Sequence, residues 1–137
     1  MKSFKIVFLS ILALSILTIS SCKKSEGDGG KATITGKVWI KRYIDPTGTL
    51  ITMSGEYAGA YEDVYIIYGD DATFGAKVKT NPDGVYEFNY LRTGKYTIYA
   101  YSSGLTVTPS NRVAVIKEVE ITKKTQTVEC EIINLAK

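Results

Sequence analysis

The stretch NPDGVYEFNYLRTGKYTIYAYS, residues 81–102, alternates large apolar and polar residues twice, with a pause between the two runs. It opens with Asn-Pro-Asp-Gly, a turn sequence, because proline presets φ and Asp-Gly tolerates positive φ. Alternation with a period of two is the pattern of a β-strand with one buried face. We therefore expect two strands, whose inward-facing residues are Tyr86 and Phe88 in the first and Tyr96, Ile98 and Ala100 in the second.

The pause itself is Leu-Arg-Thr-Gly, residues 91–94. Because both flanking runs resume the same alternation, the four residues predict a corner at which the chain reverses or changes sheets. Leu91 is the one apolar residue of the corner, and we expect it to tuck beneath the loop as a plug. The pause is thus interpreted as a corner between two strands of one β-sandwich.

The chain from residue 32 onward repeats this pattern, and it contains no amphipathic helical stretch of useful length. About seven strands are expected, with turn sequences about every 8–12 residues, which is typical of an all-β sandwich. The predicted inward faces of the earlier strands carry Ile34, Val38 and Ile40 in one strand and Val64, Ile66 and Tyr68 in another.

The segment at 43–58 and the C-terminal third depart from the simple hairpin pattern. Residues 43–58 are longer than a hairpin needs and predict an extended hairpin or an excursion on the rim of the sandwich. In the C-terminal third, Val113 and Val115 and the run EVEIT (118–122) indicate strands. The last strand is predicted at residues 127–133, with Val128, Cys130 and Ile132 facing inward and Glu129 and Glu131 facing outward.

The N-terminus has the composition of an export signal. Lys2 and Lys5 precede an apolar run of 14 residues, Ile6 to Ile19. A membrane-spanning helix needs about 20 apolar residues, so this run is too short to span and is typical of a signal peptide. An uncleaved membrane anchor is the alternative.

The sequence Ile19-Ser20-Ser21-Cys22 resembles the bacterial lipobox. The resemblance implies that a diacylglyceryl group is attached to the Cys22 thiol, that cleavage occurs before Cys22 and that the new N-terminus is acylated. Several acyl chains hold a protein stably at a bilayer, where one chain binds only marginally.

These features divide the chain into three parts: a cleaved signal peptide (1–21), a lipidated cysteine with a flexible linker (22–31) and a β-sandwich (32–137). The linker sequence KKSEGDGGK, residues 23–31, has no apolar residue and three glycines. Lys23 in place of aspartate, by resemblance to enterobacterial sorting, implies transport to the outer membrane. The composition of the linker resembles that of Bacteroidetes lipoproteins. The protein would then lie on either the periplasmic or the external face of the outer membrane.

The series ITGKV (34–38), EDVYIIY (62–68) and TNPDGVYEFNYLRTGKYTIYAY (80–101) resembles the carboxypeptidase regulatory-like domain, a transthyretin-like and Ig-like β-sandwich. The resemblance covers residues 32–101 well and the remainder only by strand count. It implies accessory, adhesive or scaffolding roles without catalytic residues. Every matching residue has a structural role in a turn, in the corner or in the core. These residues are Gly36, Val38, Gly84, Tyr86, Phe88, Leu91, Gly94, Tyr96 and Ile98.

Composition excludes several functions. The formal net charge is +3, and without Lys2 and Lys5 it is 15 − 14 = +1, so no electrostatic footprint for nucleic acid is present. The chain contains no histidine, which excludes histidine-dependent hydrolases of related folds and histidine-ligated iron or zinc sites. We expect no cofactor and no enzymatic activity.

We interpret the remaining acidic residues, Ala100 and Cys130 as parts of the fold rather than of a reactive site. Adjacent acids on a strand point to opposite faces, so Glu62 and Asp63 are not expected to chelate a metal together, and Asp70-Asp71 fits a solvated turn. Ala100 occupies the position at which isopeptide-forming adhesin domains carry a glutamate, so no cross-link between Lys37 and Asn134 is expected. Cys130, on an inward-facing position, is expected to be a buried core residue.

The ten tyrosines are the remaining feature of note. Four aromatic residues occupy strand positions that alternate with the core positions, so they are expected on the outer face of a sheet. There they could form an exposed binding platform for a sugar or a protein. Alternatively, they lie on half-buried faces because tyrosine suits strands, or the excursion at 43–58 covers them as a minor core. The platform candidates are Trp39, Tyr65, Tyr99 and Tyr101.

Taken together, these patterns predict a non-enzymatic lipoprotein of the outer membrane, held at the bilayer through Cys22, whose sandwich is an accessory binding or spacer module at the cell envelope. Its partner would be a protein or a glycan. Two alternatives are a glycan-binding module of a surface uptake system and a small adhesin or pilus component with an open edge strand.

The anchor is directly testable. Cys22→Ala removes the thiol that would receive the lipid, so we expect an unlipidated precursor that does not fractionate as a mature outer-membrane lipoprotein. Cell fractionation and intact mass measure this. Normal processing and membrane retention of the variant would show that Cys22 is not the anchor.

Overall fold

The structure is a computed structural model that describes residues 25–44, 52–103 and 112–137. The predicted signal peptide and Cys22 lie outside these residues, as do residues 45–51 of the excursion. Nine strands form within the described ranges, and no helix there is long and apolar enough to cross a membrane. The strands are β1 (Asp28–Ile44), β2 (Thr52–Ala58), β3 (Asp63–Tyr68), β4 (Ala76–Lys79), β5 (Val85–Leu91), β6 (Gly94–Ser103), β7 (Arg112–Ile121), β8 (Thr127–Glu129) and β9 (Ile133–Ala136).

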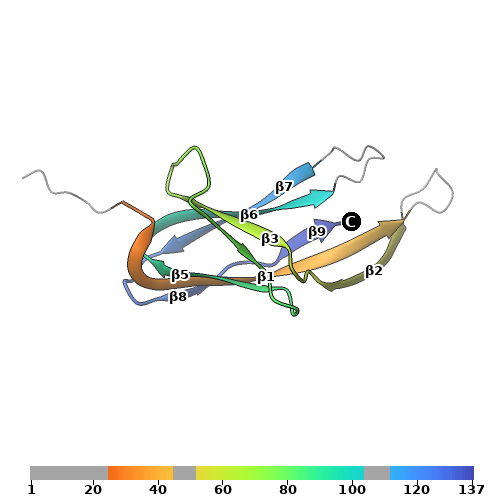
Figure 1. Cartoon of the computed structure of the whole chain (residues 1–137), viewed down its shortest axis with the longest axis horizontal. Coiled ribbons are helices and arrows are strands. Elements are labelled where there is room, and N and C mark those ends of the chain that lie inside the picture. Colours follow the sequence, from red (N-terminus) through yellow and green to blue (C-terminus); the bar gives the residue numbers. More distant parts are fainter. Residues whose placement is uncertain (1–24, 45–51, 104–111) are drawn as a thin grey trace, which may run out of the picture.

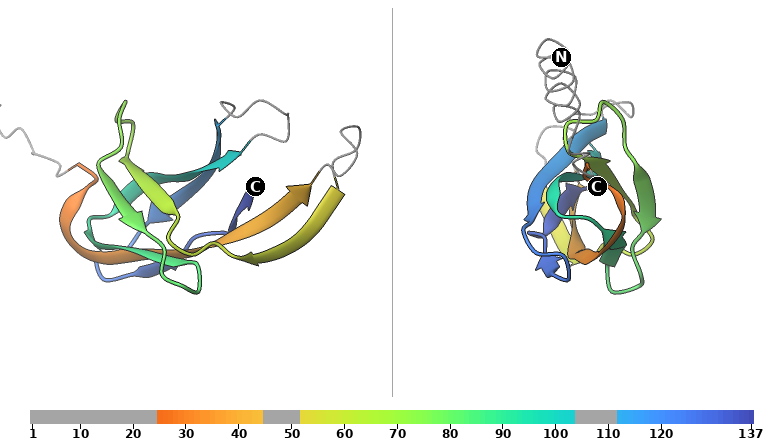
Figure 2. Two further views of the ribbon diagram at one scale, coloured as in Figure 1. Left: turned by 45° about the vertical axis from the view of Figure 1, so that its right-hand side comes forward. Right: turned by 90° about the vertical axis from the view of Figure 1, so that its left-hand side faces the viewer.

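The strands form two sheets that face one another, so the predicted all-β sandwich is confirmed (Figures 1 and 2). One sheet has the order β4-β3-β6-β7. The other is built around β1, which pairs with β2 and β5 in antiparallel fashion and with β8 and β9 in parallel. Nine strands exceed the expected seven, because the excursion returns as β2 and the last segment divides into β8 and β9.

The corner at residues 91–94 joins the two sheets. β5, which ends at Leu91, pairs with β1, whereas β6, which starts at Gly94, pairs with β3 and β7. Leu91 is 1% exposed, which confirms its role as a plug. The Tyr96 hydroxyl donates a hydrogen bond of 2.7 Å to the Arg92 carbonyl and holds the corner to the following strand.

The core lies between the inner faces of the two sheets, as the alternation predicted. Burial of these apolar side chains supplies the main driving force for folding. The buried residues expected from the sequence include Ile34, Val38, Ile40, Val64, Ile66, Tyr86, Phe88, Tyr96, Ile98, Ala100 and Cys130.

The last segment departs from the expected alternation. Ile132, predicted to face inward, is 50% exposed, while Ile133 is fully buried. β8 and β9 both follow β1, pairing Glu129 with Thr35 and Ile133 with Val38. Between these pairs β1 advances by three residues and the last segment by four. The one extra residue reverses which side chains face the core.

Val113 is 52% exposed although it pairs with Ser102, a buried residue, and so has inward parity. It lies near the start of β7, where the two sheets diverge (Figure 2). Parity alone therefore does not bury it.

The folded domain begins before residue 32, the start predicted from the sequence. The Gly27 amide donates to the Tyr96 hydroxyl at 3.0 Å, and the Gly27 carbonyl accepts from the Arg92 amide at 2.9 Å. The Tyr68 hydroxyl donates to Asp28 Oδ1 at 3.0 Å. From Ser25 onward, the predicted flexible linker (22–31) therefore belongs to the folded domain, and β1 already begins at Asp28.

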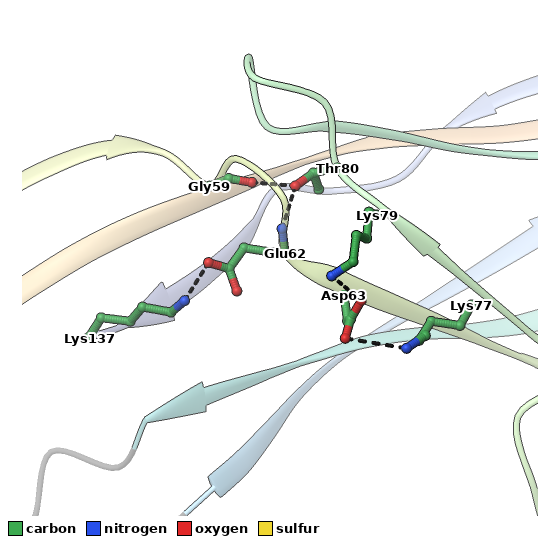
Figure 3. Close-up of polar contacts among 7 residues, drawn as sticks. All are labelled: Gly59, Glu62, Asp63, Lys77, Lys79, Thr80 and Lys137. Carbon is green, nitrogen blue, oxygen red and sulfur yellow. Dashed lines mark hydrogen bonds and ion pairs between the residues drawn. The ribbon is translucent and has the colours of Figure 1, made fainter.

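Thr80 is a buried polar residue at the start of the β4–β5 turn (Figure 3). Its hydroxyl donates to the Gly59 carbonyl at 2.5 Å and accepts from the Glu62 amide at 2.8 Å. The side chain thus connects two segments that are distant in sequence and satisfies two backbone groups.

Thr80→Val keeps the shape of the side chain but leaves both backbone groups without a partner. Because each buried unsatisfied group costs about 1–3 kcal/mol, we expect the free energy of unfolding to fall by about 2 kcal/mol or more. Thr80→Ser, the control, keeps the hydroxyl and should lose only about 1 kcal/mol from its missing methyl group. Chemical denaturation measures both variants, and equal stability of Thr80→Val and wild type would contradict the assignment.

Candidate functional site

The outer face of the β4-β3-β6-β7 sheet carries a row of side chains that crosses all four strands. In register, Lys77 lies opposite Tyr65, Tyr65 opposite Tyr99, and Tyr99 opposite Ile116. Directly cross-strand side chains on one face lie close enough to pack against each other. The sheet therefore brings Tyr65 and Tyr99 together although they are distant in sequence.

The rings of four residues form a continuous group, which we call the aromatic cluster: Tyr65, Phe74, Tyr99 and Tyr101. Tyr65 and Tyr99 stack with ring centroids 4.9 Å apart and planes within 11°. Phe74 and Tyr101 meet the Tyr65 ring edge-on at 5.1 and 5.7 Å, and Tyr101 meets Tyr99 edge-on at 5.6 Å. These are the favoured geometries for aromatic pairs.

The aromatic cluster is only partly covered. Phe74 is 50% and Tyr101 39% exposed, and Tyr65 and Tyr99 are half-buried against them. Ile116, at 57% exposure, extends the apolar surface onto β7. Exposed apolar patches of this kind on a folded domain are typical of contact sites.

Cations flank the aromatic cluster on two sides. Lys77 Nζ lies 5.8 Å from the Tyr65 ring centroid, and the Arg112 guanidinium lies 5.9 Å from that of Tyr101. Both separations are within the range of cation–π attraction. The surface thus combines ring faces and edges, phenol hydroxyls and two positive charges.

Burial also affects the hydroxyl groups of the cluster. The pKa of Tyr99 is raised, first because the ring is partly desolvated and further because Tyr101 lies beside it. At neutral pH the Tyr99 phenol is therefore protonated and can both donate and accept hydrogen bonds. The cluster can bind a neutral polyhydroxyl ligand, or one with scattered negative charge, but it has no group poised for proton transfer.

The structure does not bring Trp39 to the cluster. Trp39 belongs to β1 in the other sheet, where it lies between Ala58 of β2 and Asn134 of β9. It is half-buried, with Lys37 Nζ 5.1 Å from its ring centroid. The predicted platform of four residues is thus reduced to Tyr65, Tyr99 and Tyr101, because alternation fixes the face of a strand but not the sheet to which it belongs.

Two members of the apolar surface were not predicted. Phe74 lies in the loop between β3 and β4, where no strand periodicity exists to place it. Ile116 lies on β7 with outward parity, so alternation along that strand could have found it. The described part of the 43–58 excursion, including β2, pairs with β1 and belongs to the other sheet.

Two of the candidate acidic residues, Glu62 and Asp63, are paired with lysines (Figure 3), whereas Asp70 and Asp71 lie exposed at the turn after β3. Asp63 contacts Lys79 at 3.0 Å and Lys77 at 3.4 Å, and hydrogen bonding from Lys79 is the main cause that lowers the pKa of its carboxyl. Glu62 instead pairs with Lys137. Within the described residues no group of three or more potential metal ligands occurs.

Cys130 is buried at 5% exposure, as predicted, and lies beside Tyr86. Burial raises the pKa of the Cys130 thiol, so it is protonated at neutral pH and is a poor nucleophile. Ala100, at the position where a cross-linking domain has its glutamate, is fully buried. Neither residue provides reactive chemistry.

Comparisons with known proteins do not assign a family. No family model matches the chain, and no curated protein sequence matches it significantly. Among solved structures, it is similar to a crystal structure from Pseudomonas aeruginosa described as a "putative carbohydrate binding protein", with 11% identity and a TM-score of 0.45. The similarity covers 83% of this chain and 92% of that one, and it is too distant to indicate a shared ligand.

Proposed function

We propose that this protein is a non-enzymatic lipoprotein of the cell envelope, anchored through Cys22, whose β-sandwich is an accessory binding module. The aromatic cluster is the binding site in this proposal. The single observation that carries it is that the Tyr65 ring packs against Phe74, Tyr99 and Tyr101 on the outer face of one sheet, and that the cluster stays partly exposed.

A glycan is the ligand class that this surface fits best. The apolar faces of sugar rings pack on aromatic rings, while phenol hydroxyls and cationic side chains satisfy the sugar hydroxyl and carboxylate groups. Lys77 and Arg112 lie beside the rings and would supply these charges. The cluster lies across the face of a sheet, so it fits an extended chain of sugar units better than a single small molecule.

The absence of histidine from the sequence and the pairing of Glu62 and Asp63 with lysines support a binding role over a catalytic one. The apolar run followed by Ile-Ser-Ser-Cys supports export and lipidation. An accessory module of a surface uptake system would need both properties.

A second candidate is a small adhesin or pilus component, which one specific observation favours. β7 is ten residues long and pairs with β6 along one edge, while no described strand pairs with its other edge. Val113 and Ile116 of this strand are both more than half exposed. A donor strand from another chain could extend the sheet here. Such a subunit would form concentration-dependent assemblies, whereas a glycan-binding module need not.

The glycan proposal is tested by retention of the full chain on insoluble cellulose, chitin, xylan and peptidoglycan. We expect retention on at least one, and a roughly fivefold loss of affinity in each of Phe74→Ser and Tyr101→Ser, since each removes a ring contact of about 1 kcal/mol. Thermal melting of the two variants should change little, because both rings are substantially exposed.

Tyr57→Ser is the matched control. Tyr57 has the same 50% exposure as Phe74 but lies on β2 in the other sheet. It should keep full retention. Absence of retention on every polysaccharide, or equal retention by the cluster variants and wild type, would contradict the proposal.

A further inference from the structure

The pole at which the chain enters the domain has a composition of its own. We call it the entry pole and define it by residues 25–31, the corner at 91–94 and the β7–β8 turn at 122–126. The Ser25 carbonyl accepts a hydrogen bond of 3.2 Å from Arg92 Nη1, and the Arg92 amide donates to Gly27. The chain is therefore fixed to the corner from residue 25 onward.

A half-open groove of about 410 Å³ lies in the entry pole. One wall is a wide bulge of β1, in which Asp28 and Ala32 both pair with Leu91, so that residues 29–31 have no separate partners in the ladder. A side chain at Gly30 would place its Cβ atom 1.8 Å from the Leu91 carbonyl oxygen, so only glycine permits this close approach. The other walls are the 91–94 corner and the β7–β8 turn.

The groove is lined by cations and by no acidic residue. Lys31 comes from the bulge, Arg92 from the corner and Lys124 from the turn. Two acids lie nearby but do not line the groove: Asp28 accepts a hydrogen bond from the Tyr68 hydroxyl, and Glu26 packs beside Gly94. Within the described residues, Lys31, Arg92 and Lys124 form no ion pair, so the three positive charges that line the groove favour an anion in it.

Arg92 is the group that most needs such a partner. Its Nη1 is bonded to Ser25, but its Nε is buried and has no hydrogen-bond partner, and it forms no ion pair within the described part of the chain. Buried polar atoms are normally hydrogen-bonded. A guanidinium group binds the oxygen atoms of a phosphate through paired N–H groups, in the geometry that phosphate recognition uses most.

The length of the chain places this groove beside the bilayer if Cys22 is lipidated. Three residue steps separate Cys22 from Ser25, and an extended chain spans at most about 3.6 Å per residue, or about 11 Å in total. That distance is close to the Debye length of about 8–10 Å at physiological salt. Lys23 and Lys24, the intervening residues, add two further positive charges.

We infer that the groove of Lys31, Arg92 and Lys124 binds the phosphate of an anionic lipid headgroup, one with no cationic group of its own, in the membrane to which the chain is anchored. The inference rests on the lipid anchor of the proposed function and adds a second, non-covalent contact with the bilayer. With both contacts the entry pole faces the membrane. The ends of the β1–β2 and β6–β7 pairs lie at the opposite pole and point away from it (Figures 1 and 2).

The test uses the full chain, processed and lipidated in a Gram-negative host and reconstituted in nanodiscs. One set of nanodiscs contains phosphatidylcholine alone, and the other contains phosphatidylcholine mixed with anionic phosphatidylglycerol. Hydrogen–deuterium exchange is followed in peptides that cover residues 91–94 and 122–126. We expect exchange at both segments to slow several-fold in the anionic nanodiscs and not in the neutral ones.

Lys31→Ser with Lys124→Ser should abolish this protection, whereas Lys41→Ser with Arg42→Ser, which removes the same charge from the distal half of β1, should keep it. Unchanged exchange of β6 amides confirms that each variant is folded. Equal protection in neutral nanodiscs, or protection that survives the loss of Lys31 and Lys124, would overturn the inference. Equal protection by free glycerol phosphate in neutral nanodiscs would overturn the assignment to a lipid.

The two proposals can fail separately in this experiment. The mass of the N-terminal peptide reports whether Cys22 carries lipid, which tests the anchor. The exchange at the entry pole reports the headgroup contact. A lipidated chain without protection refutes the groove alone.

Discussion

The contact between Tyr86 and Gly36 is the constraint on which the sandwich depends. The Tyr86 ring lies across β1 so closely that a Cβ atom at Gly36 would be 2.3 Å from its hydroxyl oxygen. Tyr86 is 2% exposed and cannot move aside without disturbing the core. At this point β1 changes partners, from β5 and β8 on its first half to β2 and β9 on its second half. One glycine thus permits a 17-residue strand to hold four others.

The length of β1 gives the molecule two separate ends with different properties. Its first residues join the 91–94 corner at the entry pole, where Lys31, Arg92 and Lys124 converge. Its last residues extend with β2 to the opposite end (Figure 1). The second sheet carries the aromatic cluster on its outer face. A domain attached to a membrane by one pole would therefore leave this face accessible to a ligand in the surrounding medium.

Much of this architecture could be predicted from the sequence, because local patterns encode local geometry. The alternation at 81–102 fixed the inward faces of β5 and β6, and Leu91 with Gly94 marked the corner between the sheets. The pairing of strands was not encoded locally, so Trp39 could not be separated from Tyr99. The extra residue before Ile133 could not be predicted either, because a bulge is defined by the pairing with the partner strand and not by the sequence of one strand. Phe74 and the groove around Arg92 arise from loops, which carry no periodic signal.

In the arrangement we propose, the domain is held to the membrane by its entry pole and presents its other end to the surroundings. Spin labels at Asp70→Cys and Ser103→Cys test it most directly, because Gly69 bonds to Lys95 near the entry pole whereas Ser103 ends β6 at the far pole. Cys130 is buried and should not be labelled. In vesicles that contain nickel-chelating lipid, the label at residue 70 should relax strongly and the label at residue 103 weakly. Equal relaxation of the two labels, or the reverse order, would contradict the account.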